Sequence, residues 1–278
     1  MDYLYHYTSL ETLALILSNQ TICFNNLLYV DDIEEAETKD MGKFGRFVYV
    51  SCWTDDEMES IPLWNMYTPN MHGVRIRMKT FPFKRYHFSK DELFCVQDIE
   101  TYINLRKIYN ENKMSIVPEL PKLEKVQYSD LEEDLFPQVK TESYNGATEY
   151  FLKAKCIEDV ARCGANIEYS FIKLGKYKRT NWQFQREWRY IITASPMGMQ
   201  EQSPATFEKH QEYIRRIEDL ELDPPYKQIF LELSEDALDD IEIMLGPRMN
   251  LAEKILAKAL IEKYCPKAKC VESALMIK

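Results

Sequence analysis

The sequence predicts one mixed α/β (α+β) domain over residues 1–278. Segments rich in β-branched and aromatic residues, typical of strands, alternate with helix-like segments in 3–80 and again in 180–275. The chain has 278 residues, 45% of them hydrophobic, so it is long enough to bury a full core. A charged fraction of 29% without low-complexity tracts indicates a folded protein rather than a disordered one.

The first predicted unit is a short strand that leads directly into a helix. The strand covers Tyr3–Tyr7, and the helix runs over about 10–18. Thr8 and Glu11 have the spacing of a capping box, and Ser9 is an alternative N-cap. Because free backbone N–H groups and the helix dipole favour phosphate at such a junction, it is a candidate nucleotide-binding element.

The later elements follow from the same patterns. An acidic helix or loop is expected at Asp31–Glu37, a helix near Ser60 with Pro62 in its first turn, and an amphipathic helix over Leu251–Tyr264. Residues 90–178 are expected to form a predominantly helical insertion beside the sheet. The expected strands are Thr21–Phe24, Arg46–Trp53, Gly73–Met78, Trp182–Thr193, Gln228–Leu233, Ile241–Leu245 and a closing strand near Cys270–Val271.

Composition limits the classes of function. No apolar run approaches the roughly 20 residues that cross a bilayer, and the N-terminus lacks a signal-peptide pattern, so we expect no membrane contact and a cytoplasmic location. The seven cysteines are odd in number and include no C-x-x-C pair, which favours reduced structural thiols over a zinc site. The four histidines lack H-E-x-x-H spacing and no G-x-S-x-G elbow is present, so neither a metal hydrolase nor a serine hydrolase is indicated.

The charged residues support two opposite predictions about nucleic-acid binding. The formal net charge of −10 opposes non-specific binding to nucleic acid, which depends on neutralising phosphates. The stretch Lys173–Arg189, however, contains a single acidic residue, Glu187, among its basic residues. It predicts either a basic face beside Glu187 or an ordinary solvated surface. Aromatic residues available for base stacking interleave within it: Tyr177, Trp182, Phe184 and Trp188.

Four segments carry side chains suited to a nucleotide site, and each alone has an ordinary structural explanation. His6 lies in the middle of a strand, where a satisfied structural histidine is the usual finding. Strand alternation places Gln185, Glu187 and Arg189 on one face, which a surface salt-bridge ladder would also explain. The aromatic candidates have the spacing of core residues: Trp53, Trp64 and Tyr67.

In their order along the chain, these segments resemble the H-Y-E class of ADP-ribosyltransferases, which includes diphtheria-toxin-like toxins, the poly(ADP-ribose) polymerases and, more loosely, DarT. They are also similar to an uncharacterised bacterial and phage family that begins with a Y-H-Y-T-S signature. The resemblance covers most of 3–80 and 170–275. It implies an ADP-ribosyltransferase-like split mixed sheet, NAD+ as co-substrate and no metal. The segments that carry it are Tyr5-His6-Tyr7-Thr8-Ser9-Leu10-Glu11, Val50-Ser51-Cys52-Trp53, Trp64-Asn65-Met66-Tyr67 and Trp182 to Arg189 with Glu187-Trp188.

The resemblance implies roles for the first two segments and for the aromatic residues. His6 would hydrogen-bond the ribose of the adenosine half, and the backbone of Tyr7 and Thr8 would hold the nicotinamide amide. Trp64 or Tyr67 would stack on the nicotinamide ring. Trp53 would flank that ring.

The last segment would carry the chemistry. Glu187 would hold the 2′-hydroxyl of the nicotinamide ribose and stabilise the positive charge that develops as the glycosidic bond breaks. Gln185 matches the first residue of a Q-x-E motif, which contacts the acceptor. Because guanidinium groups bind phosphate in a bidentate manner, one of three arginines would grip the pyrophosphate: Arg46, Arg75 or Arg77.

The predicted function is transfer of ADP-ribose from NAD+ to a macromolecule, by a toxin or antiphage effector. The stretch Lys173–Arg189 slightly favours RNA or DNA over protein as the acceptor. A toxin of this kind implies a neutralising antitoxin protein. Two alternatives stay open: an NAD+ glycohydrolase, which needs the same pocket and the same Glu187, and a catalytically inactive nucleotide-binding or partner-docking module.

Overall fold

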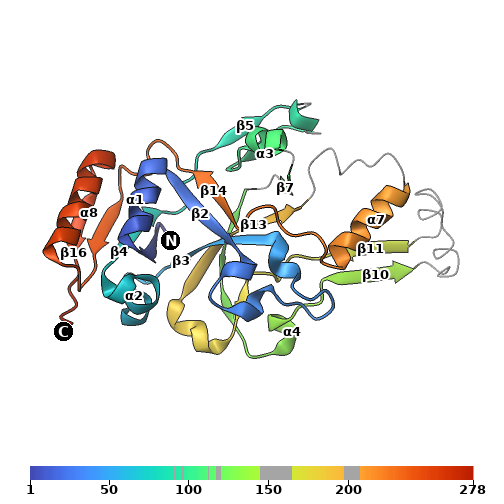
Figure 1. Cartoon of the computed structure of the whole chain (residues 1–278), viewed down its shortest axis with the longest axis horizontal. Coiled ribbons are helices and arrows are strands. Elements are labelled where there is room, and N and C mark those ends of the chain that lie inside the picture. The colour runs from blue at the N-terminus through green and yellow to red at the C-terminus, as the bar shows by residue number, and fades with distance from the viewer. Residues whose placement is uncertain are drawn as a thin grey trace.

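The computed structural model describes residues 1–90, 92–94, 97–111, 113–116, 120–144, 165–196 and 207–277. The fold is mixed α/β, as predicted, and is built on a sheet of ten strands (Figure 1). These strands are β1 (Tyr3–Thr8), β2 (Thr21–Asn26), β3 (Val48–Thr54), β4 (Val74–Lys79), β7 (Ser115–Ile116), β8 (Lys122–Lys125), β13 (Glu187–Ser195), β14 (Gln228–Glu232), β15 (Glu242–Leu245) and β16 (Lys269–Glu272).

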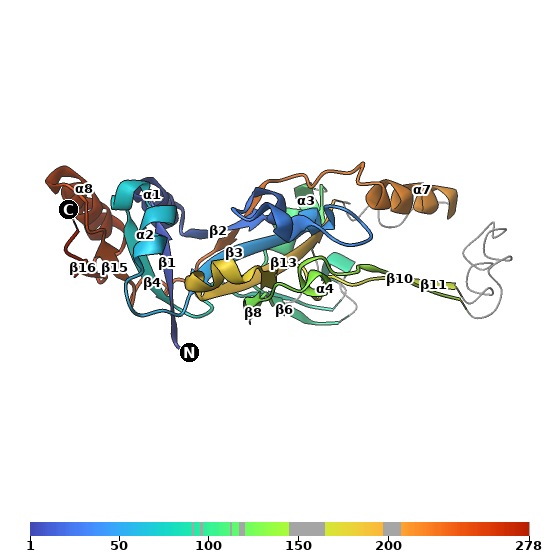
Figure 2. The same cartoon turned by 90° about the horizontal axis from the view of Figure 1, so that it is seen from below.

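The sheet divides at β3. Along one edge β3 pairs with β13 over its whole length. Along the other edge, β2 pairs only opposite Tyr49 and Val50, and β1 pairs only opposite Thr54. Among the described strands, Ser51–Trp53 therefore have no partner on that edge. One arm of the split continues as β2–β14 and the other as β1–β4–β15–β16, and the two arms run in clearly different directions (Figure 2).

The N-terminal unit connects the two arms. β1 leads into α1 (Leu10–Asn19), and the N-cap is Ser9, whose Oγ accepts a hydrogen bond from the Thr12 N–H at 3.1 Å. Of the two predicted caps, Ser9 is therefore the one that forms and Thr8 is not. The helix buries Leu13 and Leu17 in the main core, and α1 in turn packs against α8 (Leu251–Tyr264).

Gly73 fixes how closely β4 approaches the end of β1. A Cβ at this position would lie 2.5 Å from the Cβ of Thr68 and against the carbonyl oxygen of Thr8. Any larger residue would have to displace backbone. The glycine thus lets β1 and α2 (Ile61–Tyr67) pack together, and α2 begins, as predicted, at the Ser60 N-cap.

Two predicted strands begin later than expected. Arg46 belongs to the 3₁₀ helix η3 (Phe44–Phe47), so β3 starts at Val48. The segment from Trp182 forms the 3₁₀ helix η6 (Thr180–Gln185), and Arg186 adopts a left-handed conformation with φ of 45° before β13 begins. Periodicity missed this because Arg186 is not a residue type typical of φ > 0. The predictions for β2, β14, β15, α8 and the closing strand β16 are confirmed within two residues.

The expected helical character of 90–178 is wrong for the described part of that range, where strand residues outnumber helical ones; 145–164 lies outside the described residues. β7 and β8 pair with the outer edge of β13, and this edge pairing overrides local helix propensity. The described elements within or at the border of the range are β5 (Tyr86–Phe88), η5 (Glu92–Phe94), β6 (Ile99–Thr101), α3 (Leu105–Glu111), β9 (Gln127–Tyr128), α4 (Glu132–Leu135), β10 (Lys140–Tyr144), β11 (Ala165–Tyr169) and β12 (Tyr177–Lys178).

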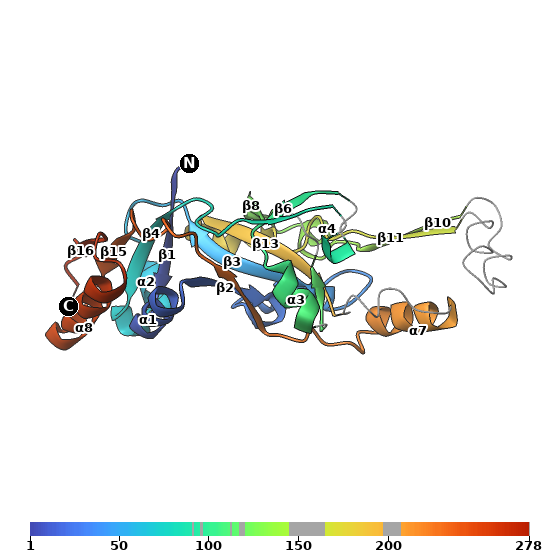
Figure 3. The same cartoon turned by 90° about the horizontal axis from the view of Figure 1, so that it is seen from above.

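The molecule is elongated. The β10–β11 hairpin and α7 (Phe207–Glu218) extend from one end, whereas α8 and β16 lie at the other (Figure 3). Among the described helices, none combines the length and the apolar character that a bilayer crossing requires.

Candidate functional site

A cleft opens at the split of the sheet, beside the unpaired segment Ser51–Trp53. Its wider part has a volume of about 530 Å³ and extends over α1 and β2, and a narrower part of about 70 Å³ continues towards α2. The wider part is within the size range of small-molecule sites, roughly 300–1,000 Å³. Both parts are lined by His6, Tyr7, Cys52, Trp53, Tyr67 and Glu187.

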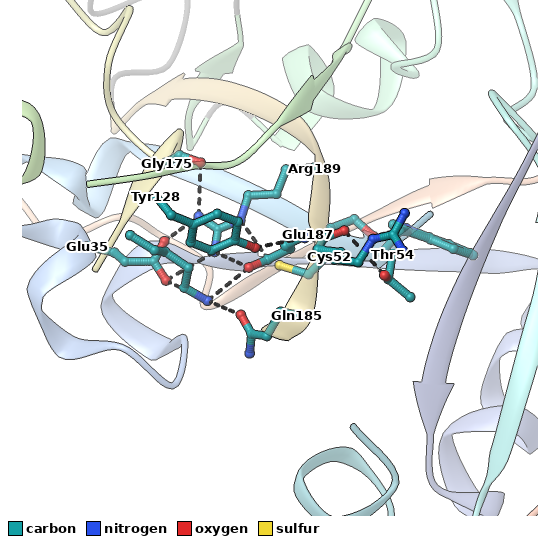
Figure 4. Close-up of polar contacts among 12 residues, drawn as sticks. Glu35, Cys52, Thr54, Tyr128, Gly175, Gln185, Glu187 and Arg189 are labelled. Carbon is teal, nitrogen blue, oxygen red and sulfur yellow. Dashed lines mark hydrogen bonds and ion pairs between the residues drawn. The ribbon is translucent and has the colours of Figure 1, made fainter. Parts of the chain in front are cut away.

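Glu187 lies on the floor of the cleft within a buried cluster of four charges (Figure 4). Its Oε1 accepts a hydrogen bond from Arg189 Nε at 2.7 Å, and its Oε2 accepts one from Lys178 Nζ at 2.9 Å. Glu35, from the 3₁₀ helix η2 (Ile33–Ala36), pairs with both cations. We call these residues the Glu187 cluster: Glu35, Lys178, Glu187 and Arg189.

The two cations of the Glu187 cluster are fully engaged. All five N–H groups of Arg189 have acceptors, namely Glu35, Glu187 and the Gly175 carbonyl. The three N–H groups of Lys178 face Glu35, Glu187 and Gln185. Burial of charge is costly unless it is paired in this way, so the cluster is a rigid, satisfied unit.

Each member of this cluster whose pKa is shifted is held in its ionised form by the charges of its neighbours. Burial opposes ionisation of Glu187, but attraction by Arg189 and Lys178 outweighs it and lowers the pKa of Glu187 to about 2. Burial and Arg189 disfavour the charged form of Lys178, yet Glu187 and Glu35 raise its pKa above the ordinary value. Two carboxylates and two cations thus give the cluster no net charge.

Cys52 closes the cluster on the side of the cleft. Burial, followed by the charge of the neighbouring Glu187 carboxylate, raises the pKa of its thiol well above the usual value. A neutral thiol is a poor nucleophile, so Cys52 is suited to donating a weak hydrogen bond and not to covalent catalysis.

His6 also lines both parts of the cleft and is held in one tautomer. Its Nδ1–H donates to the Cys52 carbonyl at 2.9 Å, because a carbonyl can only accept. Burial lowers the pKa of His6, although the bond to Cys52 partly counters this effect. The ring packs against Trp53 with centroids 5.1 Å apart. At neutral pH His6 is therefore an uncharged imidazole whose Nε2 is a hydrogen-bond acceptor.

Tyr67 and Gln185 link the remaining wall to the cluster. Gln185 Nε2 donates to the Tyr67 hydroxyl at 2.6 Å, while Gln185 Oε1 accepts from Lys178 Nζ at 2.9 Å. Burial, followed by the charge of the nearby Asp31 carboxylate, raises the pKa of Tyr67. The amide of Gln185 is thus fixed in orientation, and Tyr67 is a neutral ring at the edge of the cleft.

The structure distinguishes between the two aromatic candidates of α2. Trp64 is fully buried, packs edge-on against Tyr7 at 4.9 Å between ring centroids and donates its Nε1–H to Glu59 at 3.1 Å. It is a core residue and does not line the cleft, whereas Tyr67 does. The other predicted residues that line the cleft are His6, Tyr7, Thr8, Trp53, Gln185 and Glu187.

None of the three candidate pyrophosphate arginines lines the cleft. Arg75 and Arg77 of β4 lie over the rings of Tyr5 and Tyr3, because the β1–β4 register places these side chains together. Arg46 is directed to the other side of the molecule, where it pairs with Asp223 at 3.0 Å. The cations that do line the cleft, Lys178 and Arg189, belong to the basic stretch Lys173–Arg189 and not to the arginines predicted to bind pyrophosphate.

The basic face expected over Lys173–Arg189 does not form. Lys178 and Arg189 are buried in the Glu187 cluster. Each of the other cations in the stretch pairs with a carboxylate: Lys173 with Asp134, Lys176 with Glu124, Arg179 with Glu34, and Arg186 with Asp55 and Asp56. The predicted surface salt-bridge ladder is also wrong for Gln185, Glu187 and Arg189, because all three side chains are buried.

The described residues contain free cysteines and no cluster of metal ligands. The described cysteines are free thiols, namely Cys23, Cys52, Cys265 and Cys270; Cys95, Cys156 and Cys163 lie outside the described residues. No group of three or more His, Cys, Asp or Glu side chains in the described ranges is arranged to hold a metal ion. Comparisons with models of protein families, with curated proteins and with solved structures gave no match.

Proposed function

We propose that this protein transfers ADP-ribose from NAD+ to a macromolecular acceptor, as a toxin or antiphage effector. One observation carries the proposal: His6, Tyr67, Gln185 and Glu187, which are far apart in the sequence, line one cleft at the split of the sheet. A histidine, an aromatic ring and an ionised glutamate are the three groups that the H-Y-E resemblance requires in one site.

The neutral His6 suits the ribose of the adenosine half, since its Nε2 accepts a hydrogen bond from a hydroxyl. Tyr67 offers a ring for the nicotinamide, and stacked aromatic pairs contribute about 0.5–1.5 kcal/mol beyond burial. The C1′–N bond of the nicotinamide ribose breaks, nicotinamide leaves with the bonding electrons, and the acceptor attacks C1′ and loses a proton. Glu187 stabilises the positive charge that develops at C1′.

Cys52 marks the side from which a substrate would reach Glu187, because both residues line the cleft. The donors to the carboxylate are the charged groups of Lys178 and Arg189, which are held by further ion pairs. A ribose hydroxyl that approaches beside the uncharged Cys52 thiol would bond to Glu187 without breaking any ion pair.

A second candidate is a nucleotide-binding module without catalysis. The closed Glu187 cluster favours it, because Lys178 and Arg189 already neutralise the charge of Glu187. In this case the cleft would bind a nucleotide, and Glu187 would serve only to hold the sheet and η2 together.

The discriminating experiment measures nicotinamide released from NAD+ by the wild-type protein and by Glu187→Gln. Loss of one preorganised electrostatic group in a transition state costs on the order of 100-fold or more in rate, so we expect at least that decrease with NAD+ binding retained. The matched control is Glu235→Gln, an exposed glutamate outside the cleft, which leaves the rate unchanged. Equal release by wild type and Glu187→Gln, or binding without release, contradicts the enzyme and supports the module.

The same assay separates transfer from hydrolysis. With NAD+ labelled in the adenylate part and a cell extract, a transferase labels macromolecules. An NAD+ glycohydrolase produces only free ADP-ribose. Two further parts of the proposal are a cytoplasmic location and a neutralising antitoxin protein as partner.

A further inference from the structure

A second cavity adjoins the cleft across the edge strand β14. It has a volume of about 420 Å³ and is bounded by β14, α3 and the β5–β6 hairpin. It shares lining residues with the cleft, so the two cavities are neighbours, and we refer to them together as the groove, which extends from Glu187 past β14 to α3. The shared residues are Asn19, Thr21, Gln228 and Phe230.

Aromatic rings line this groove at intervals. Tyr86, Tyr102 and Tyr226 form walls of the second cavity, and Phe230 lies at the boundary between the cavity and the cleft. Tyr29 stands at the outer rim of the cleft. Phe230 and Tyr29 are 54% and 51% exposed, so part of each ring is open to stack on a planar ligand, and Lys227 lies over one face of Tyr29.

Lysines lie beside these rings. Lys113 Nζ is 5.6 Å from the centroid of Tyr226, and Lys227 Nζ is 5.0 Å from the centroid of Tyr29. Lys107 of α3 lines the second cavity itself. Within the described residues none of these three lysines has a carboxylate within ion-pair distance, in contrast to the fully paired stretch Lys173–Arg189.

Three lysines without an ion-pair partner among the described residues thus lie at the groove of a chain whose formal net charge is −10. The carboxylates that line the groove are Asp31, Glu111, Glu187 and Glu232. Glu232 pairs with Lys84 at 3.0 Å, Glu111 accepts a hydrogen bond from the hydroxyl of Tyr226, and Glu187 is paired within its own cluster.

We propose that this groove binds the acceptor as a single-stranded nucleic acid, with bases against Tyr226, Phe230 and Tyr29 and phosphates beside Lys107, Lys113 and Lys227. Exposed rings with adjacent cations match the alternation of planar base and phosphate in a single strand, and stacking of this kind tolerates any base. The inference rests on the proposed function, because the strand would present a nucleotide to the cleft at Glu187. It places the acceptor on β14 and α3 and not on the Lys173–Arg189 stretch.

The first test is binding of fluorescently labelled 20-nucleotide oligothymidine and oligouridine to the full chain, measured by anisotropy at several salt concentrations. Phe230→Leu, which removes an exposed ring but keeps an apolar residue, should weaken binding on the order of tenfold. The combined change Lys107→Gln, Lys113→Gln and Lys227→Gln should weaken binding and reduce the slope of log affinity against log salt by about 2.

The matched control is Lys263→Gln on α8. Lys263 also lies over a tyrosine ring, 4.8 Å from the centroid of Tyr264, but outside the groove. We expect it to bind oligonucleotides like the wild type. Absence of oligonucleotide binding at low salt, or equal loss in Lys263→Gln and the groove variants, overturns the proposal.

Nicotinamide release in the same preparations separates this inference from the proposed function. In one outcome wild type releases nicotinamide, protein in a nuclease-treated extract is still labelled, and added oligonucleotides do not reduce this labelling. The acceptor is then a protein. That outcome overturns the groove proposal and leaves the transferase intact. If wild type releases no nicotinamide, the proposed function fails, and the binding data alone then decide whether the groove holds a single strand.

Discussion

Replacement of Arg189 by methionine tests the Glu187 cluster most sharply. Arg189 donates two hydrogen bonds to Glu35, two to Glu187 and one to the Gly175 carbonyl, and its side chain is only 1% exposed. Methionine fills much of the volume but removes every one of these donors. Glu35 and Glu187 would then share Lys178 alone, which leaves one uncompensated negative charge in the interior.

Removing one partner from a buried ion-pair network costs about 3–5 kcal/mol, so we expect a decrease of that size in the free energy of unfolding. Urea denaturation followed by tryptophan fluorescence measures it as a lower midpoint at an unchanged slope. Glu35→Gln in the Arg189→Met background removes the excess charge and should restore part of the loss, since neighbouring charges couple by about 0.5–3 kcal/mol.

Lys176→Met is the matched control, because Lys176 pairs with Glu124 at 2.9 Å in a partly exposed position. Pairs of that kind contribute about 0–1 kcal/mol. A loss below about 1 kcal/mol in Arg189→Met, or no recovery in the double variant, would refute the account of the cluster as a coupled, buried unit.

Three further predictions concern pH, the aromatic residues and the β1–β4 contact. Because folding lowers the pKa of Glu187 to about 2, the ionised carboxylate stabilises the fold at pH values above the ordinary pKa of a glutamate. The difference in free energy of unfolding between wild type and Glu187→Gln should therefore shrink by about 3 kcal/mol as the pH falls from 5 towards 2. Urea titrations that show a constant difference over this range would contradict the prediction. Tyr67→Ala should weaken NAD+ binding about tenfold, as measured by calorimetry, because Tyr67 lines the cleft. Trp64→Phe should leave NAD+ binding unchanged and lower only the free energy of unfolding, by about 1–3 kcal/mol, because Trp64 packs in the core. The reverse pattern would show that the nicotinamide stacks on Trp64 and not on Tyr67. Gly73→Ala should lower the free energy of unfolding by about 1–3 kcal/mol, because the new Cβ would lie 2.5 Å from the Cβ of Thr68. An unchanged melting temperature would show that the contact can relax.

Local sequence patterns predicted the elements that frame the cleft. Capping residues and hydrophobic spacing are local properties, so the start of α1 at Ser9 and of α2 at Ser60 could be predicted to within a residue. The start of β13 could not, because Arg186 adopts its left-handed turn without glycine or asparagine to signal it. That turn is what allows Gln185, from a 3₁₀ helix, to contact the same lysine as Glu187.

Contacts between residues far apart in the sequence explain why parts of the site could not be predicted. Glu35 and Arg189 are separated by 154 positions, and no local pattern indicates that an acidic segment after β2 would pair with so distant a strand. Similarly, periodicity placed Arg75 on a strand correctly, but only the packing of β4 against β1, in which Arg75 pairs with Tyr7 and lies diagonally over Tyr5, shows where its side chain goes.

A structure determined after soaking crystals with NAD+, or with an analogue that cannot release nicotinamide, tests the central claim most directly. The account predicts the nicotinamide ring against Tyr67, a hydroxyl of its ribose within hydrogen-bond distance of Glu187, and the adenosine ribose beside His6. A nucleotide bound away from the split of the sheet, or one in the cleft that leaves Glu187 untouched, would contradict it.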